Sequence, residues 1–198
     1  GHHAGSENVD KIVTYAFERG VKTLTLYAFS SENWARPKEE VDELMKLLKS
    51  YLKKFVKKVI TNDVRLRIIG GRDELSPDLL KVIEESENAT KDCKGNNLNI
   101  ALNYGGRQEI VRVVNKLIAE NQPITEQNIC NNLDTAPCGE PDLIIRTGGE
   151  YRTSNFLIYQ GAYSELYFTD VLWPDFNQQE FDKALENFSQ RKRRFGKV

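Results

Sequence analysis

The sequence predicts an α/β fold in which a central, mostly parallel sheet is flanked by helices. Short apolar runs of strand length alternate with longer segments of helical periodicity, which is typical of strands joined by helical crossovers. The chain has 198 residues, enough to bury the core of one domain of ordinary to large size. We therefore expect a single domain over residues 1–198.

Five apolar runs are the expected strands. They are TLTLYAF (23–29), VRLRIIG (64–70), LNIALNY (98–104), LIIRT (143–147) and ELYFT (165–169). Because segments of helical periodicity separate them, we expect most of the strands to run in the same direction.

The longest helical segment spans residues 37–60. Pro37 suits the first turn, where its missing N–H would be unpaired anyway. Apolar residues recur at steps of three and four, which predicts an amphipathic helix: Val41, Leu44, Met45, Leu48, Leu52, Phe55, Val56 and Val59. Further helices are expected at residues 76–93, 105–121, 125–133 and 177–196, and a surface loop at 134–140.

The opposite face of the long helix is rich in lysine. Two interpretations fit such a face, namely a solvated surface and a surface that rests on anionic lipid. The lysines are Lys46, Lys49, Lys53, Lys54, Lys57 and Lys58.

Charge and composition exclude several function classes. The 28 basic and 29 acidic side chains nearly cancel, so no global positive field favours a nucleic-acid partner. No apolar run approaches membrane-spanning length and no signal-peptide pattern is visible, so we expect a soluble protein. Neither the G-x-x-x-x-G-K-[ST] loop nor a strand-linked G-x-G-x-x-G occurs, which argues against the common nucleotide-binding loops.

Residue types that bind metals are few. Three cysteines without a close pair indicate neither a disulfide framework nor a thiolate site, and they fit a reducing compartment. His2 and His3 are the only histidines, which excludes a multi-histidine site; by composition alone they also fit the remnant of a purification tag. Glu165 is a candidate ligand, since magnesium usually takes one or two carboxylates together with substrate phosphates.

The first four expected strands lead into polar turns. These are SSENWAR (30–36), GGRDELS (70–76), YGGRQE (104–109) and RTGGEYRTSN (146–155). Ligands bind outside the carboxyl ends of parallel strands, so we expect the turns to converge on one crevice. Three turns place Gly-Gly next to arginine, and such N–H groups and guanidiniums bind phosphate oxygens. A phosphate or diphosphate ligand is predicted, although each Gly-Gly alone also fits a plain turn.

The fourth turn carries the strongest anion-binding pattern. Arg146 and Arg152 flank its glycines, and Ser154 is placed to donate to an oxygen, so the three suit a doubly charged diphosphate. A purely structural interpretation is also open. In that interpretation Arg146 pairs with Asp142 or Glu150, and Ser154 caps a following helix.

Longer blocks of sequence carry a resemblance to a known family. The blocks are GHHAG (1–5), LYAFSSENWARPKEEV (26–41), LNIALNYGGRQEIV (98–111), DLIIRTGGEYRTSNFLIYQGAYSELYFTDVLWPDF (142–176) and RRFG (193–196). In this order, and over essentially the whole chain, the sequence resembles the cis-prenyltransferases of the bacterial undecaprenyl diphosphate synthase (isoprenyl transferase) type.

The resemblance implies a homodimeric enzyme of undecaprenyl diphosphate synthase-like fold that requires Mg2+. Such an enzyme condenses isopentenyl diphosphate onto an allylic diphosphate such as farnesyl diphosphate, with cis geometry at each new double bond. The expected product is a long-chain polyprenyl (undecaprenyl) diphosphate, the lipid-carrier precursor for cell-wall synthesis. The corresponding location is the cytoplasm, with peripheral contact at the inner face of the membrane.

The resemblance also implies roles for residues of the last two strands. Arg146, Arg152 and Ser154, together with Thr153, match the group that holds isopentenyl diphosphate. Glu165 matches a magnesium ligand. These positions coincide with the residues that the fourth turn and the metal chemistry single out.

The first polar turn matches the family segment that orders the two substrates. Asn33 is similar to a residue proposed to help remove the proton, and it is the expected catalytic residue. The expected substrate-binding residues of this turn are Ser30, Ser31, Glu32, Trp34 and Arg36.

The two chain ends match further family features. His2 corresponds to a histidine near the allylic diphosphate, and Arg194 with Gly196 matches an Arg-x-Gly that reaches into the partner subunit's site. Upstream of His2 the family carries a segment of the type Met-Asp-Gly-Asn-Gly-Arg-Trp-Ala, whose aspartate activates metal and diphosphate; the sequence begins after it, and we expect the protein to carry it. Tyr151 stands where bacterial members often have histidine.

Two alternatives concern the growing product and the activity itself. The apolar stripe that includes Leu44, Met45, Leu48 and Leu52 could line a product tunnel, or it could be ordinary core. A non-catalytic partner subunit or prenyl-diphosphate-binding module is the alternative to the enzyme, and a generic phosphotransferase is a weaker one.

Overall fold

The computed structural model describes residues 2–197, except for the side chains of His2 and His3. The backbone falls into two compact units. The three-stranded unit comprises Val21–Cys138, and the two-stranded unit comprises Gly1–Gly20 together with Gly139–Val198. No helix among the described residues is long and apolar enough to cross a membrane.

The three-stranded unit is built on a parallel sheet in the order β1-β3-β2. Its strands are β1 (Thr23–Ser30), β2 (Arg65–Ile69) and β3 (Asn97–Tyr104). Leu24 and Leu66 both lie opposite Leu98, so the carboxyl ends of all three strands meet at one edge. The central strand β3 is buried at every residue after its first, as expected for a parallel sheet covered on both faces.

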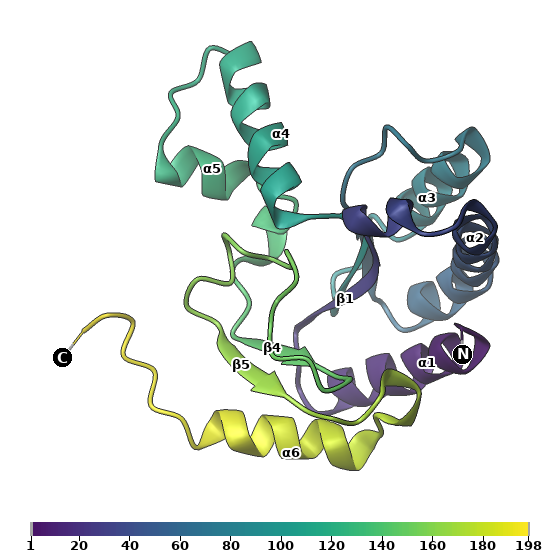
Figure 1. Cartoon of the computed structure of the whole chain (residues 1–198), viewed down its shortest axis with the longest axis vertical. Helices are drawn as coiled ribbons and strands as arrows, with labels where there is room; N and C mark the ends of the chain where they lie inside the picture. The colour runs from purple at the N-terminus through teal and green to yellow at the C-terminus, as the bar shows by residue number, and fades with distance from the viewer. Residues whose placement is uncertain (1, 198) are drawn as a thin grey trace. The chain divides into compact units, whose positions relative to one another are not determined.

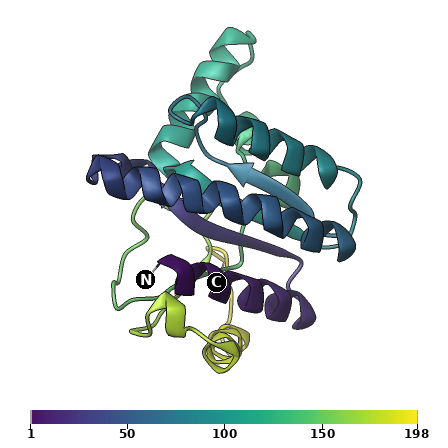
Figure 2. The same ribbon diagram turned by 90° about the vertical axis from the view of Figure 1, so that its right-hand side faces the viewer.

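Four helices and two single turns complete this unit. Helices α2 and α3 lie side by side along the sheet (Figure 2) and pack on each other and on β2. Ser76 caps α3 by accepting a hydrogen bond from the N–H of Leu79 at 3.3 Å. The elements are η1 (Ser31–Ala35), α2 (Lys38–Thr61), α3 (Pro77–Ala89), α4 (Gly106–Ala119), α5 (Glu126–Asn132) and η2 (Ala136–Cys138).

Helix α2 confirms the expected amphipathic pattern. Its apolar stripe is buried at four positions, namely Val41, Leu52, Phe55 and Val59. Other positions of the stripe, among them Leu44, Met45 and Leu48, are half-buried. The lysines of the opposite face are exposed except Lys49, which is half-buried and pairs with Asp78 at 3.5 Å.

The two-stranded unit joins the beginning of the chain to its end. Its elements are α1 (His2–Glu18), β4 (Leu143–Arg146), β5 (Glu165–Phe168), η3 (Trp173–Asp175) and α6 (Gln178–Ser189). The two strands are parallel, and α1 packs against α6 and η3 (Figure 1). Asn8 Nδ2 donates to the backbone carbonyls of Trp173 and Phe176 at 2.6 and 2.9 Å. Buried Ala16, Phe176 and Phe181 belong to this core.

All five expected strands form, and within each unit they run parallel. The sequence-based assignment omitted α1, although Ile12, Val13 and Ala16 repeat at helical spacing and are buried. Helix α6 ends at Ser189 rather than near residue 196. The chain turns away after it, and Phe195 and Gly196 have φ values of +50° and +74°.

The predicted surface loop at residues 134–140 is wrong in one respect. It contains the turn η2, and Thr135 is only 4% exposed. Asp134 receives a hydrogen bond from Arg112 at 2.6 Å and another from the N–H of Gly70 at 3.0 Å. The segment is therefore anchored to β2 and α4 through Asp134.

Candidate functional site

The turn after β4 brings together the residues that sequence analysis assigned to a diphosphate. Arg146 Nη1 donates to Ser154 Oγ and to the carbonyl oxygen of Arg152, each at 2.6 Å. The intervening glycines make this return possible, because Gly148 and Gly149 have φ values of +92° and +79°. The Arg146 guanidinium thus lies against the Ser154 hydroxyl and the backbone of Arg152, and the side chains of Arg152 and Ser154 are exposed.

The purely structural interpretation of this turn is wrong for Arg146 and Ser154. Asp142 pairs with Arg193 at 2.6 Å, and Glu150 pairs with Arg152 at 2.6 Å. Among residues 2–197, Arg146 forms no ion pair, and Ser154 precedes turns rather than a helix. The positive charge of Arg146 is thus held beside the hydroxyl without a neutralising carboxylate.

The glycine N–H groups of this turn do not contribute to anion binding. Gly148 N–H donates to the carbonyl of Val171 at 2.9 Å, and Gly149 N–H donates to that of Thr169 at 3.0 Å. Both donors are therefore used inside the fold. The side chains of Arg146, Arg152 and Ser154 remain the candidate anion-binding groups of the turn, and Thr153 is half-buried.

Glu165, the expected magnesium ligand, opens β5. Its Oε2 accepts a hydrogen bond from Arg191 Nη1 at 2.7 Å, and Arg191 also donates to Leu166 O and to Asn187 Oδ1. Among the described side chains, no group of three or more His, Cys, Asp or Glu could hold a metal ion. Glu165 fits Mg2+ as a single protein carboxylate beside substrate phosphates, provided that Arg191 moves away from it.

The segment after α6 leaves its last basic residues exposed. Arg193 is held in place by Asp142, by the carbonyl of Tyr163 and by the ring of Phe195, whose centroid lies 4.5 Å from the guanidinium carbon. Arg194 and Gly196, which the sequence assigned to a partner's site, are exposed. Their exposure leaves them accessible to a second chain.

The turn after β1 forms η1 and is closed by its own polar residues. Asn33 Oδ1 accepts a hydrogen bond from the N–H of Ser30 at 3.0 Å. Ser30 Oγ and Ser31 Oγ both donate to Glu32 Oε2, at 3.0 and 3.2 Å. The Ser30, Asn33 and Glu32 side chains thereby share one short turn at the carboxyl end of the sheet.

Trp34 and Arg36 anchor the two flanks of this turn. The Trp34 ring packs edge-on against buried Phe29 at a centroid distance of 5.0 Å. Arg36 pairs with Glu40 at 2.8 Å, one turn further along the chain. Arg36 is exposed, so its guanidinium can exchange this carboxylate for a ligand at little cost.

Sequence analysis missed Asn103, which joins the turn after β1 to the turn after β2. Asn103, only 5% exposed, accepts a hydrogen bond from Trp34 Nε1 at 2.7 Å, and its Nδ2 donates to Gly71 O at 3.0 Å and Glu74 Oε2 at 2.6 Å. Its φ of +50° is one that asparagine tolerates well. An asparagine two residues before Gly-Gly, at the carboxyl end of a predicted strand, was the signal that could have identified it.

The turn after β2 is not a phosphate cradle. The N–H of Gly70 donates to Asp134 and that of Gly71 to Asn103 O, and Arg72 binds Glu87 at 3.0 Å. A Cβ at Gly70 would lie 1.9 Å from Leu102 O, so glycine is required there for close packing of β2 on β3. The anion-binding prediction is wrong for these two N–H groups.

The predicted residues therefore form two clusters, one in each unit. The three-stranded unit gathers the β1 turn around Ser30, Asn33 and Trp34. In the two-stranded unit, Arg146 contacts the Ser154 hydroxyl and the backbone carbonyl of Arg152. The side chain of His2 lies outside the described residues, and its expected role stays a prediction.

Comparison with known proteins identifies the family. The profile of a family described as "Putative undecaprenyl diphosphate synthase" matches residues 1–196. The chain is 50% identical to an isoprenyl transferase of Aquifex aeolicus over 100% of this chain and 86% of that protein. An isoprenyl transferase of Neisseria gonorrhoeae is 46% identical over 100% of this chain and 80% of that protein.

Solved structures agree with this result. A probable undecaprenyl diphosphate synthase from Campylobacter jejuni superposes with a TM-score of 0.92 at 36% identity, covering 100% of this chain and 94% of that one. Lavandulyl diphosphate synthase from Lavandula x intermedia, in complex with dimethylallyl diphosphate, gives 0.95 at 35% identity, covering 100% and 88%. Taken with the sequence matches, these similarities show that the chain belongs to the undecaprenyl diphosphate synthase family and is a prenyltransferase enzyme.

Proposed function

We propose that the protein condenses isopentenyl diphosphate onto an allylic diphosphate such as farnesyl diphosphate, with cis geometry, to make a long-chain polyprenyl diphosphate. Undecaprenyl diphosphate, the lipid-carrier precursor for cell-wall synthesis, is the proposed product. Membership of the family supports this proposal. The single observation that carries it is the hydrogen bond of 2.6 Å between Arg146 and Ser154, which holds an arginine without a carboxylate beside a hydroxyl.

The proposed reaction exchanges one bond for another. The C–O bond of the allylic diphosphate breaks and diphosphate leaves with the bonding electrons. The terminal carbon of isopentenyl diphosphate forms a C–C bond with the allylic carbon, and the proton lost from C2 of the isopentenyl unit passes to a diphosphate oxygen. Arg146 and Arg152 hold the isopentenyl diphosphate, with Ser154 donating to the same group and Thr153 beside it. Fixing that anion orients the attacking carbon, which lowers the entropic part of the barrier.

Asn33 acts in this proposal by positioning rather than by accepting the proton into its own amide. A carboxamide is not a base near neutral pH, and its Oδ1 already accepts the N–H of Ser30. Its Nδ2 can donate a hydrogen bond to a diphosphate oxygen, and that oxygen is a stronger base than the carboxamide of Asn33. Trp34 and Arg36 order the substrates on either side, and the hydroxyls of Ser30 and Ser31 share Glu32.

Mg2+ is the proposed cofactor. Glu165 would hold it together with substrate phosphates after Arg191 has moved away. When bound, the ion neutralises charge that develops on a departing diphosphate. Glu165 would hold the ion from the start of β5.

A homodimer is the proposed assembly. The two-stranded unit exposes large apolar side chains, including Leu166 at 37%, Tyr163 at 58% and Phe195 at 53%, a pattern common at interfaces. Arg194 and Gly196, on the same exposed segment, would enter the partner subunit's site. The proposed location is the cytoplasm, with the exposed lysines of α2 offering contact with anionic lipid.

The experiment uses the full-length protein. Radiolabelled isopentenyl diphosphate, farnesyl diphosphate and Mg2+ are expected to give polyprenyl diphosphates longer than the primer. Arg152→Ala is expected to lower turnover by orders of magnitude, whereas Lys11→Ala, which removes an exposed charge on α1, is expected to leave it unchanged. Complete inactivity of the unmodified full-length protein with these substrates would refute the proposal.

A further inference from the structure

The outer edge of β2 is closed by side chains instead of another strand. β2 is the end strand of its sheet, so the N–H groups of Leu66, Ile68 and Gly70 point away from β3. Thr90 Oγ1 accepts the first at 3.1 Å, Glu87 Oε1 the second at 2.8 Å, and Asp134 Oδ2 the third at 3.0 Å. The edge therefore has no donor left for pairing with another chain.

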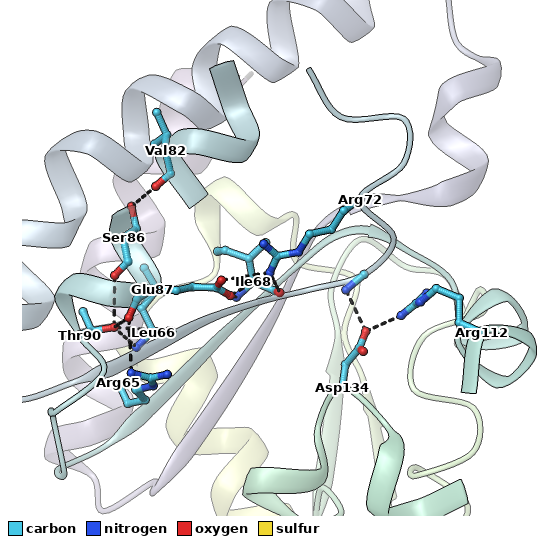
Figure 3. A network of polar contacts seen from close by, with 11 residues as sticks. Arg65, Leu66, Ile68, Arg72, Val82, Ser86, Glu87, Thr90, Arg112 and Asp134 are labelled. Carbon is cyan, nitrogen blue, oxygen red and sulfur yellow. Dashed lines mark hydrogen bonds and ion pairs between the residues drawn. The ribbon is translucent and has the colours of Figure 1, made fainter. Parts of the chain in front are cut away.

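The two carboxylates at this edge are also neutralised. Arg72 Nη2 lies 3.0 and 3.1 Å from the oxygens of Glu87, and Arg112 Nη2 lies 2.6 Å from Asp134 Oδ2 (Figure 3). Each carboxylate thus has both a backbone N–H and a guanidinium. Neither is available to cancel the charge of another nearby cation.

Two further arginines line the same region without a counter-charge. Arg65 and Arg67 are two residues apart on β2, so they lie on one face of the strand about 7 Å apart. Arg65 Nη1 reaches only the carbonyl of Glu87 at 3.4 Å, and Arg67 Nη1 donates to Asn97 Oδ1 at 2.7 Å and contacts Cys138 Sγ at 3.5 Å. Among residues 2–197 neither forms an ion pair.

These arginines open into a cavity of about 360 Å³, whose wall also includes Arg72, Glu87 and Asp134. With the two ion pairs cancelled, the charge that remains at the wall comes from Arg65 and Arg67. A guanidinium carries five N–H donors, and the protein uses only one nitrogen of each. The cavity therefore offers donors and positive charge but few free acceptors.

We propose that this cavity is an anion site for a phosphate or diphosphate group, held by Arg65 and Arg67 at the edge of β2. Paired guanidiniums match phosphate oxygens in both charge and geometry. The saturated carboxylates do not repel such an anion, because Arg72 and Arg112 already hold them. The site shares no residue with the proposed prenyl-transfer machinery and does not depend on it.

The test titrates the full-length protein, with 15N-labelled arginine side chains, with inorganic pyrophosphate at constant ionic strength. The Nε–Hε signals of Arg65 and Arg67, assigned from the single variants Arg65→Gln and Arg67→Gln, are expected to shift and saturate. In each single variant, the signal of the remaining arginine is expected to report pyrophosphate binding at least tenfold weaker. The double variant Arg65→Gln/Arg67→Gln is used in the vesicle and activity measurements. Lys11→Gln/Lys116→Gln removes the same formal charge from exposed positions on α1 and α4 and is expected to change nothing.

A second arm identifies the source of the phosphate group. Sedimentation with phosphatidylglycerol vesicles, against phosphatidylcholine vesicles, reports a lipid headgroup; pyrophosphate binding without vesicle binding reports a free anion. Loss of either interaction in the arginine variant but not in the lysine variant supports the site. The proposal is overturned if pyrophosphate shifts neither of the two arginine signals, or if chloride at equal ionic strength shifts them by the same amount. Prenyl transfer by the arginine variant is expected to continue, so failure here and failure of the proposed function are separable.

Discussion

Arg191 Nη1 lies 2.7 Å from Glu165 Oε2, so the carboxylate proposed to hold Mg2+ is occupied by a guanidinium. Both side chains are partly exposed, at 33% and 25%. A metal ion and Arg191 cannot both take this carboxylate at the same oxygen. The first prediction follows from that competition.

Arg191→Gln is expected to tighten metal binding about two- to fivefold, because an ion pair of this exposure contributes about 0.5–1 kcal/mol. Titration with Mn2+, followed by the electron paramagnetic resonance signal of the free ion, measures the affinity directly. Arg193→Gln is the matched control, since it removes a neighbouring arginine that pairs with Asp142 instead. An unchanged affinity in Arg191→Gln would contradict the competition.

The pH dependence of stability should reveal the contact between α1 and α6. Tyr15 Oη donates to Asp182 Oδ2 at 2.6 Å, and this hydrogen bond, followed by desolvation, raises the pKa of Tyr15 above its ordinary value of 10.0. A raised folded pKa means that the protonated phenol stabilises the fold. The stabilisation is complete below about pH 10 and is lost as the pH rises through the folded pKa.

Urea unfolding of the protein and of Tyr15→Phe between about pH 8 and pH 11 tests this expectation. The unmodified protein should unfold at a higher urea concentration near pH 8, and its margin over the variant should shrink above about pH 10. Other groups that titrate in this range affect both proteins, so the comparison cancels them. A margin that stays constant or grows with pH would show that Tyr15 is not linked to stability in this way.

Asn103→Ala is expected to lower the free energy of unfolding by about 2 kcal/mol or more, because it removes hydrogen bonds to Trp34 and Gly71 from a buried site. Trp34→Phe removes one of these bonds and keeps a ring against Phe29, so about 1 kcal/mol is expected. Urea unfolding measures both losses. Equal losses would mean that Asn103 does not join the turns after β2 and β1.

The product tunnel is tested on α2. Leu48 is half-buried, whereas Leu52 is only 1% exposed and belongs to the core. Leu48→Trp is therefore expected to shorten the polyprenyl product, as measured by thin-layer chromatography of labelled products. Leu52→Ala is expected instead to destabilise the protein by about 2–5 kcal/mol, without a directed shortening. Unchanged product length in a folded Leu48→Trp enzyme would assign Leu48 to core packing.

Parts of the fold were predictable because their signals are local. The strands β1 to β5 and the amphipathic face of α2 follow from apolar spacing within each segment. The end of α6 was not predictable in that way. The helix does not continue into the segment where Arg191 forms an ion pair with Glu165 and Arg193 forms one with Asp142. Both partners lie far away in the sequence.

The candidate site shows the same division. Arg146, Arg152 and Ser154 lie within nine residues, so their clustering around a glycine turn could be expected from the sequence. The hydrogen bonds of the glycine N–H groups could not be expected from the sequence, because their acceptors, the carbonyls of Val171 and Thr169, belong to a later segment. The sequence of a short polar turn indicates the type of ligand more reliably than it indicates which atoms remain free to bind that ligand.

The sequence by itself determined the family, the alternating strands and helices, and the residue types of a diphosphate site, since each depends on the order of residues along the chain. The tertiary structure alone decided which polar groups meet. It placed Arg191 on Glu165, joined Trp34 to Asn103, and left Arg65 without a carboxylate. Those outcomes depend on how distant elements pack, and packing brings together groups that no local pattern relates.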